Sequence, residues 1–146
     1  MRTSLRHPCI LALTAIAALL WFAPSVQAAA MLAPPDERPK DFAFIKKDGV
    51  YHLFYIRHND FLPPFATEND FGHAISTDLY HWTQLPPVMG VDPYGWDNVH
   101  VWAPHVIESG GLYWMFYTGV TDIPGQFSDT QRIGVAVSSD LMTWNR

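Results

Sequence analysis

Several residues suited to binding a ligand lie in the stretch Gly90–Asn98 and shortly after it. This stretch contains Trp96 and Asp97, and Trp102 and His105 follow. A tryptophan face can stack on the C–H groups of a sugar ring, and a carboxylate or an imidazole can hydrogen-bond sugar hydroxyl groups. These four side chains are therefore candidates for carbohydrate binding. Two alternatives stay open: acidic loops are more often only solvated, and a histidine at the start of a strand can bond a backbone carbonyl.

A metal or cofactor is not expected from these residue types. His100 and His105 are five residues apart and no Glu follows His100, so the spacing is not that of a zinc-protease helix. The chain has a single cysteine, Cys9, which can form neither an internal disulfide nor a thiolate cluster. We predict no metal site and no cofactor.

The composition excludes several classes of protein. The chain has 146 residues, 49% of them hydrophobic, which is too apolar for a disordered chain. Its formal net charge is −5. Nucleic acids and anionic membranes attract clustered Lys and Arg, so neither is expected as a partner. Nothing in the sequence fixes the oligomeric state.

The first 28 residues are predicted to be a signal peptide. Arg2 and Arg6 precede an apolar run over Ile10–Ala23, and Val26-Gln27-Ala28 fits a cleavage site. The run is shorter than the roughly 20 residues that a membrane span needs. We therefore expect a secreted or periplasmic protein with no membrane segment after cleavage, followed by a linker over residues 29–40.

The chain after residue 40 contains an internal repeat. Phe44–Trp82 aligns without gaps on Val106–Trp144, 62 residues further on, and 13 of the 39 positions are identical. Each unit predicts short strands separated by turns. The expected strands of the first unit are Phe42–Lys46, Val50–Arg57, Phe71–Ser76 and Tyr80–Leu85. Those of the second are Val106–Glu108, Leu112–Thr118 and Ile133–Ser138, with Trp144 after them.

Four-stranded units in tandem are typical of a β-propeller. Propellers close with roughly four to eight blades, whereas residues 41–146 supply about two. We therefore expect an all-β fold in which these residues are the first two blades of an incomplete propeller domain.

Repeated residues are expected to be scaffold, and unrepeated ones functional. Trp82 and Trp144 occupy the same position in each unit and are predicted to pack between blades. Asp41 has no acidic counterpart, because Ala103 stands at its position in the second unit. Asp41 is therefore a further candidate for chemistry.

The motifs resemble two families of glycoside hydrolases. Asp41-Phe-Ala-Phe44 followed by Gly49-x-Tyr51, and Trp102-Ala-Pro-His105 followed by Gly111-x-Tyr113, are similar to the blade motifs of family 43, the arabinanases and xylosidases. Tyr51–Tyr55 and Gly72–Trp82 resemble family 32, the invertases and fructanases, still more closely. The resemblance implies a five-bladed propeller that hydrolyses furanosides or xylosides, of arabinan, xylan or fructan type, with paired carboxylates.

The resemblance implies that Asp41 is the catalytic carboxylate at the mouth of the central channel. The families have Asp-Pro here, whereas this chain has Asp41-Phe42. The same resemblance places the general acid on a Glu of a later blade, and Glu37, Glu68 and Glu108 do not have that context. A non-catalytic carbohydrate-binding propeller is the main alternative, and a protein-interaction propeller is a further one.

Overall fold

The protein is described by a computed structural model that covers residue 32, residues 37–63, 66–121, 123 and 130–146. The predicted signal peptide and most of the predicted linker lie outside the described residues. Within the described part of the chain, no helix is long and apolar enough to cross a membrane.

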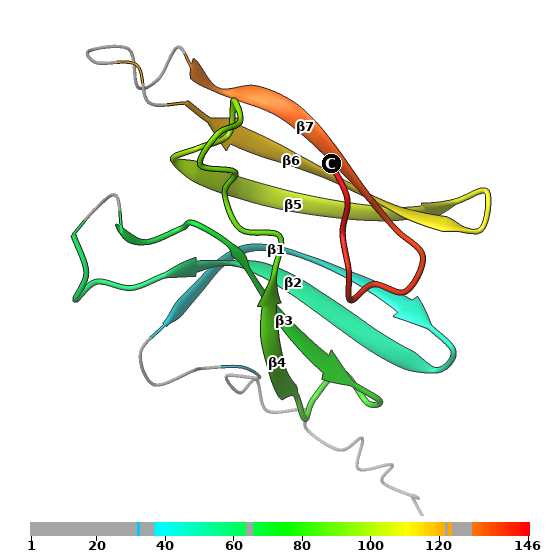
Figure 1. Cartoon of the computed structure of the whole chain (residues 1–146). Helices are drawn as coiled ribbons and strands as arrows, with labels where there is room; N and C mark the ends of the chain where they lie inside the picture. The colour runs from blue at the N-terminus through cyan, green and yellow to red at the C-terminus, as the bar shows by residue number, and fades with distance from the viewer. Residues whose placement is uncertain (1–31, 33–36, 64–65, 122, 124–129) are drawn as a thin grey trace, which may run out of the picture.

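Two antiparallel sheets form the fold, and each keeps its strands in chain order (Figure 1). The first contains β1 (Arg38–Lys47), β2 (Val50–His58), β3 (Phe71–Ser76) and β4 (Thr83–Val88). The second contains β5 (His100–Ser109), β6 (Leu112–Val120) and β7 (Arg132–Ser138). Asn145 pairs with Val137 on β7, where a fourth strand would lie. The prediction of two repeated β-meanders is confirmed.

The register of the two sheets repeats at the predicted interval of 62 residues. Lys47 pairs with Val50 in the first hairpin, and Ser109 pairs with Leu112 in the second. Each hairpin turn has two residues with positive φ, Asp48-Gly49 and Gly110-Gly111. This backbone fits the right-handed twist of the strands, and glycine adopts it at little steric cost.

Three predicted boundaries need correction. β1 begins at Arg38, inside the predicted linker, and β5 begins at His100, six residues before the predicted start at Val106. Both strands pass through a bulge that interrupts their side-chain alternation and so conceals the extra strand length. β4 begins at Thr83 instead of Tyr80, because the Oδ1 atom of Asp78 accepts the N–H groups of Tyr80 and His81 and prolongs the turn.

The core lies between the two sheets. It combines Phe54, Ile56 and Phe71 of the first sheet with Met115 and Tyr117 of the second. Trp144 meets Phe54 edge-on at 5.6 Å between ring centroids, as expected for a tryptophan that packs between blades. Burial of these apolar side chains fixes how the two sheets stack.

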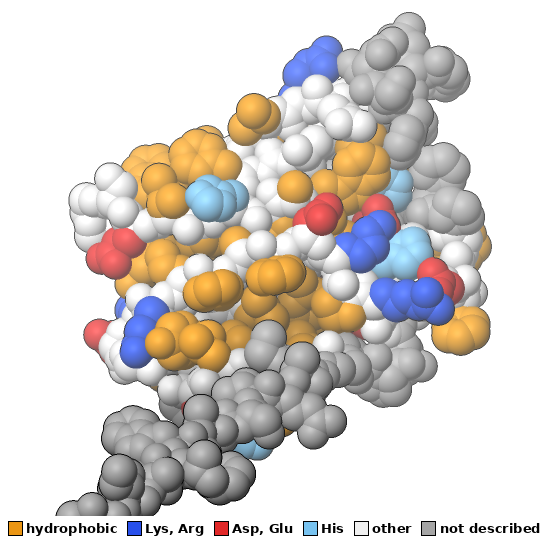
Figure 2. Space-filling view, turned by 180° about the vertical axis from the view of Figure 1, so that it is seen from behind, with side chains coloured by type: hydrophobic (Ala, Val, Ile, Leu, Met, Phe, Trp, Pro, Cys, Tyr) orange, Lys and Arg blue, Asp and Glu red, His pale blue; other side chains and the backbone are white. Residues whose placement is uncertain are grey.

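The outer faces of both sheets expose large apolar side chains. Phe42 and Phe44 are 66% and 53% exposed on β1, and Phe116 and Ile133 are exposed on β6 and β7. Figure 2 shows hydrophobic side chains spread over much of one face of the molecule. The outer face of β1 and β2, with Leu79 and Trp82, encloses an apolar hollow of about 510 Å³.

Candidate active site

A cleft of about 380 Å³ lies where the two sheets meet. It is lined by Lys40, Asp41, Ile56, Glu68, Trp102, Ala103, Thr118 and Gln131. Most of these residues occupy equivalent positions in the two repeats: Lys40 corresponds to Trp102, Asp41 to Ala103, and Ile56 to Thr118. The cleft is therefore built from the same end of both sheets.

A β-bulge places Asp41 in the cleft. The register of β1 shifts between Lys40 and Phe42, and Asp41 has a φ of 29°. The second sheet has the same irregularity, with Ala103 at a φ of 50°. A bulge re-aims the side chain it carries, and here that side chain is an exposed carboxylate.

Trp102 forms part of the cleft wall, together with Asp41. Its ring stacks on His100, with 5.2 Å between centroids and 16° between planes. The Nδ1 atom of His100 lies 3.1 Å from the carbonyl oxygen of Thr67, which anchors the histidine in turn. The indole is thus held in one orientation at the edge of the cleft.

Glu68 is a second carboxylate in the cleft, and sequence reasoning missed it. It is 9% exposed and has a φ of 62°. Its Oε1 atom lies 2.5 Å from the Nζ of Lys40 and 2.7 Å from the Nδ1 of His58. Burial opposes ionisation of Glu68, but hydrogen bonds from Lys40 and His58 outweigh it and lower its pKa.

The backbone of Glu68 also joins the two sheets. Its N–H donates to the carbonyl of Arg57 on β2, and its carbonyl accepts the N–H of Val101 on β5. Glu68 lies in the connection between β2 and β3 and aligns with Thr130 in the second repeat. The one available signal was therefore its lack of an acidic counterpart, which it shares with Asp41.

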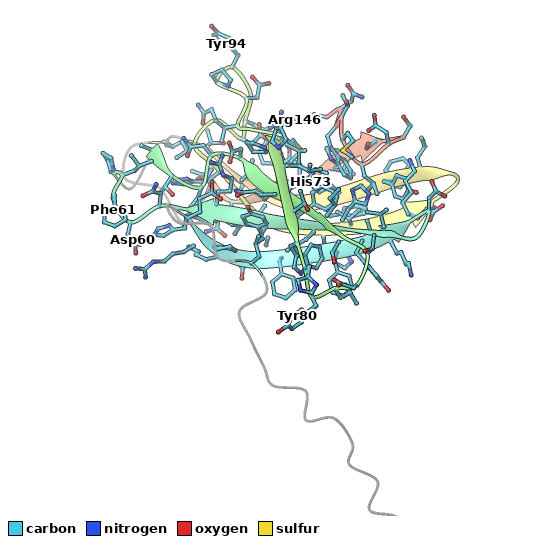
Figure 3. The ribbon with its side chains drawn as sticks, turned by 90° about the horizontal axis from the view of Figure 1, so that it is seen from below. Asp60, Phe61, His73, Tyr80, Tyr94 and Arg146 are labelled. Carbon is cyan, nitrogen blue, oxygen red and sulfur yellow. The ribbon has the colours of Figure 1, made fainter. Side chains whose placement is uncertain are left out.

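Charged side chains continue from Glu68 to the rim of the cleft. The Nε2 atom of His58 lies 2.8 Å from Asp60, and the guanidinium of Arg38 lies 2.6 Å from the other oxygen of that carboxylate. Figure 3 shows Asp60 and Phe61 together at one end of the molecule. In Figure 2, side chains of both charges and histidines gather at this end.

His105 and Trp96 do not line the cleft. His105 is exposed on β5, between the buried Pro104 and Val106, and so points to the outer face of the second sheet. Trp96 is 39% exposed, and its ring stacks on that of Tyr117 at 6.1 Å. The structure therefore separates both residues from Asp41 and Trp102.

Asp97 is a buried structural residue in this fold. It is 1% exposed, and its Oδ2 atom accepts hydrogen bonds from the hydroxyl of Tyr117 at 2.7 Å and the Nε of Arg146 at 2.8 Å. Burial and the Asp97 carboxylate raise the pKa of Tyr117 to about 12. The contact of Asp97 with a sugar stays a prediction, and the position of this residue in an acidic loop gave no sign that it is buried.

Among the described residues, no group of three or more His, Cys, Asp or Glu side chains could hold a metal ion. What the cleft offers is one exposed carboxylate, a second carboxylate held ionised by a cation, and an aromatic wall. Such a site can bind a polyhydroxylated ring and place an anion beside it.

The repeated antiparallel sheets with this cleft define the class: the two sheets are two blades of the β-propeller found in glycoside hydrolases. The exo-inulinase of Aspergillus awamori superposes with a TM-score of 0.58 over 79% of this chain and 26% of that one, at 24% identity. This likeness shows the shared fold and confirms the expected architecture.

The chain belongs to the family of the glycosyl hydrolases family 32 N-terminal domain, whose model matches residues 39–146. The acid β-fructofuranosidase AIV-18 of Capsicum annuum is 43% identical over 75 residues, which are 51% of this chain and 11% of that protein. A bifunctional 6(G)-fructosyltransferase/2,1-fructan:2,1-fructan 1-fructosyltransferase of Allium cepa is 36% identical over 102 residues, 66% of this chain and 15% of that protein. The chain thus spans less than a sixth of either relative.

Proposed function

We propose that this chain carries part of the active site of a secreted glycoside hydrolase of the β-fructofuranosidase type, which hydrolyses sucrose or fructans. Family membership and the relatives favour a fructofuranoside over the arabinans and xylans that the motifs also allowed. The observation that carries the proposal is the placement of the Asp41 carboxylate, on a bulge, in a cleft that Trp102 also lines.

Asp41 is the proposed catalytic carboxylate. Breaking a glycosidic bond builds positive charge on the ring carbon and oxygen, and a carboxylate at that carbon stabilises this charge or attacks the carbon. The bond electrons pass to the leaving oxygen, which must receive a proton from a second carboxyl group. Water then supplies the hydroxyl group of the released sugar and restores the proton.

Glu68 is unsuited to the role of proton donor. It is held ionised by Lys40 and His58, whereas a general acid must carry a proton at the working pH. The general acid is therefore proposed to lie elsewhere in the protein. Trp102 would contact the C–H groups of the sugar ring.

The signal peptide predicted over residues 1–28 would direct the protein out of the cytoplasm.

Replacement of Asp41 by Asn tests this function in the full-length protein as it is expressed. The change keeps the size of the side chain and removes its charge, so we expect sucrose or inulin hydrolysis to fall at least about a hundredfold with folding intact. The control is Asp48→Asn, in the exposed hairpin turn of the same sheet. Activity is measured in the exported and the cytoplasmic fractions.

Three results would contradict parts of the proposal. Full activity of Asp41→Asn would remove Asp41 from the mechanism. Activity confined to the cytoplasm would contradict export. Binding of fructans without any hydrolysis would favour the carbohydrate-binding propeller instead.

A further inference from the structure

Lys40 and Glu68 form an ion pair on the wall of the cleft, next to Asp41. Both residues line the cleft, and the distance from Nζ to Oε1 is 2.5 Å. The Lys40 side chain is 46% exposed, whereas that of Glu68 is 11% exposed. A buried acceptor and an accessible donor therefore stand side by side beside the proposed catalytic group.

His58 holds the Glu68 carboxylate in place. Its two ring nitrogens lie 2.7 Å from Glu68 and 2.8 Å from Asp60. Both ring nitrogens therefore face carboxylate oxygens, so His58 links Glu68 to Asp60. Arg38 binds the far oxygen of Asp60. A continuous chain of polar contacts thus runs from the rim of the cleft to Lys40.

The pair retains hydrogen-bonding capacity for a ligand. An ammonium group has three N–H donors, and one of them serves Glu68. A carboxylate has about four acceptor positions, and three of those on Glu68 serve Lys40, His58 and Trp102, which leaves one for a ligand. Sugars present neighbouring hydroxyl groups, each of which can accept from one protein group and donate to another.

We propose that Lys40 and Glu68 recognise two adjacent hydroxyl groups of the sugar ring bound at Asp41, with Lys40 donating and Glu68 accepting. This deepens the proposed function and rests on it. On a fructofuranosyl ring the adjacent hydroxyl groups are those on C3 and C4. Lys40 and Glu68 are replaced by Trp102 and Thr130 at the equivalent positions of the second blade, so the pair is not part of the repeated scaffold.

The competing explanation is that the pair only ties β1 to the second sheet through the Glu68 backbone. A structural tie affects every ligand alike, whereas hydroxyl recognition depends on which hydroxyl group is present. The test is therefore inhibition of sucrose hydrolysis by fructose, 3-deoxyfructose and 4-deoxyfructose, in the full-length protein and in its Glu68→Gln variant.

We expect Glu68→Gln to weaken inhibition by fructose about tenfold or more, as for loss of a hydrogen bond to a charged group. For the one deoxy analogue that lacks the hydroxyl group contacted by Glu68, the inhibition constants of the variant and the unmutated protein should agree within about twofold, because that contact is already absent. Glu108→Gln, on an exposed part of β5, is the matched control and should change none of the three values.

A second variant covers the risk that Glu68→Gln unfolds the protein. Lys40→Met keeps the apolar stem of a side chain that is 46% exposed and removes the ammonium. It should bind fructose more weakly, whereas its affinity for the deoxy analogue that lacks the hydroxyl group contacted by Lys40 should stay nearly the same. Equal losses for all three sugars, or no loss, in a variant that melts normally would overturn the inference. If the unmutated protein hydrolyses sucrose and Asp41→Asn does not, the proposed function holds even when the inference about Lys40 and Glu68 fails. If the unmutated protein neither hydrolyses nor binds these sugars, the proposed function and the inference both fail.

Discussion

The two blades share a backbone but differ in the side chains that face the cleft. Ser76 and Ser138 make the same turn contacts, and the following Leu79 and Leu141 have φ values of 64° and 70°. The bulge is also common to both blades. These features set strand direction and spacing, and they recur because each sheet must meet the same packing requirements.

The cleft positions show the opposite behaviour. The first blade places Lys40 and Asp41 at its bulge, and the second places Trp102 and Ala103. Since Ala103 adopts the same positive φ, the bulge does not require a carboxylate. The repeat therefore supplies the backbone geometry, and unequal side chains on it produce a cleft with a charged wall and an aromatic wall.

The largest expected effect concerns the glycines that are common to both blades. A Cβ atom at Gly72 would lie 2.2 Å from the Cζ of Tyr55, and one at Gly134 would lie 2.4 Å from that of Tyr117. Both tyrosine rings are buried and cannot easily move. We expect Gly72→Ala and Gly134→Ala each to lower the free energy of unfolding by about 3 kcal/mol, measured by urea denaturation.

Gly90→Ala is the control for this pair of substitutions. A Cβ atom there would meet the Asn69 carbonyl oxygen at 3.5 Å, which is ordinary contact, so the change should stay within about 0.5 kcal/mol. A large loss at Gly72 with none at Gly134 would show that the two blades do not use their tyrosines in the same way.

The repeat explains how much of the fold was predictable. Identical residues such as Gly49 and Gly111 mark the same turn twice, so each unit supports the assignment of the other. The starts of β1 and β5 were predicted wrongly, because the bulges at Asp41 and Ala103 interrupt the alternation of side chains. The fold was therefore predictable where the pattern was periodic.

The site was less predictable than the fold. Asp41 could be singled out because an acidic residue lacked a counterpart, and Trp102 because of its motif. Glu68 and Asp97 could not be interpreted from sequence, since their roles depend on contacts with residues distant in the chain: Lys40 for Glu68, and Arg146 for Asp97. Long-range contacts of this kind leave no local pattern.

A second difference between the blades predicts sensitivity to acid. His73 occupies the position that Val135 occupies in the second blade, and it lies among the strands in Figure 3. Its Nε2 atom lies 3.0 Å from the Nδ1 of His52, and its ring stacks on Phe54 at 4.7 Å. Burial, followed by the nearby His52, lowers the pKa of His73 to about 4.

The folded state therefore keeps His73 neutral at pH values where the unfolded chain binds a proton. Stability should fall as the pH drops from about 6.5 to about 4, by about 3 kcal/mol in total from this group. Burial and Lys47 also lower the pKa of His52, which adds to the loss in the same direction. The measurement is the urea midpoint between pH 7 and pH 4.

His73→Val gives the first blade the residue of the second and should flatten much of this pH dependence. His105→Val is the matched control, because His105 is exposed on β5. An unchanged pH dependence in His73→Val would show that other groups cause the acid sensitivity.

The smallest expected effect concerns the serine turns that the blades share. The hydroxyl of Ser76 accepts the N–H groups of Asp78 and Leu79 and donates to the Asp78 carboxylate. Ser138 makes the equivalent three contacts. We expect Ser76→Ala and Ser138→Ala each to cost about 1 kcal/mol, whereas the exposed Ser139→Ala should be neutral.

The order of these two losses refines the comparison. Leu141 is fully buried in the core between the sheets, whereas Leu79 is only half-buried on the outer face of the first sheet. A loosened turn at Ser138 therefore disturbs packed side chains, and the same change at Ser76 does so less. We expect the larger loss for Ser138→Ala, and the reverse order would indicate that another part of the protein covers Leu79 and makes the first turn the more tightly packed of the two.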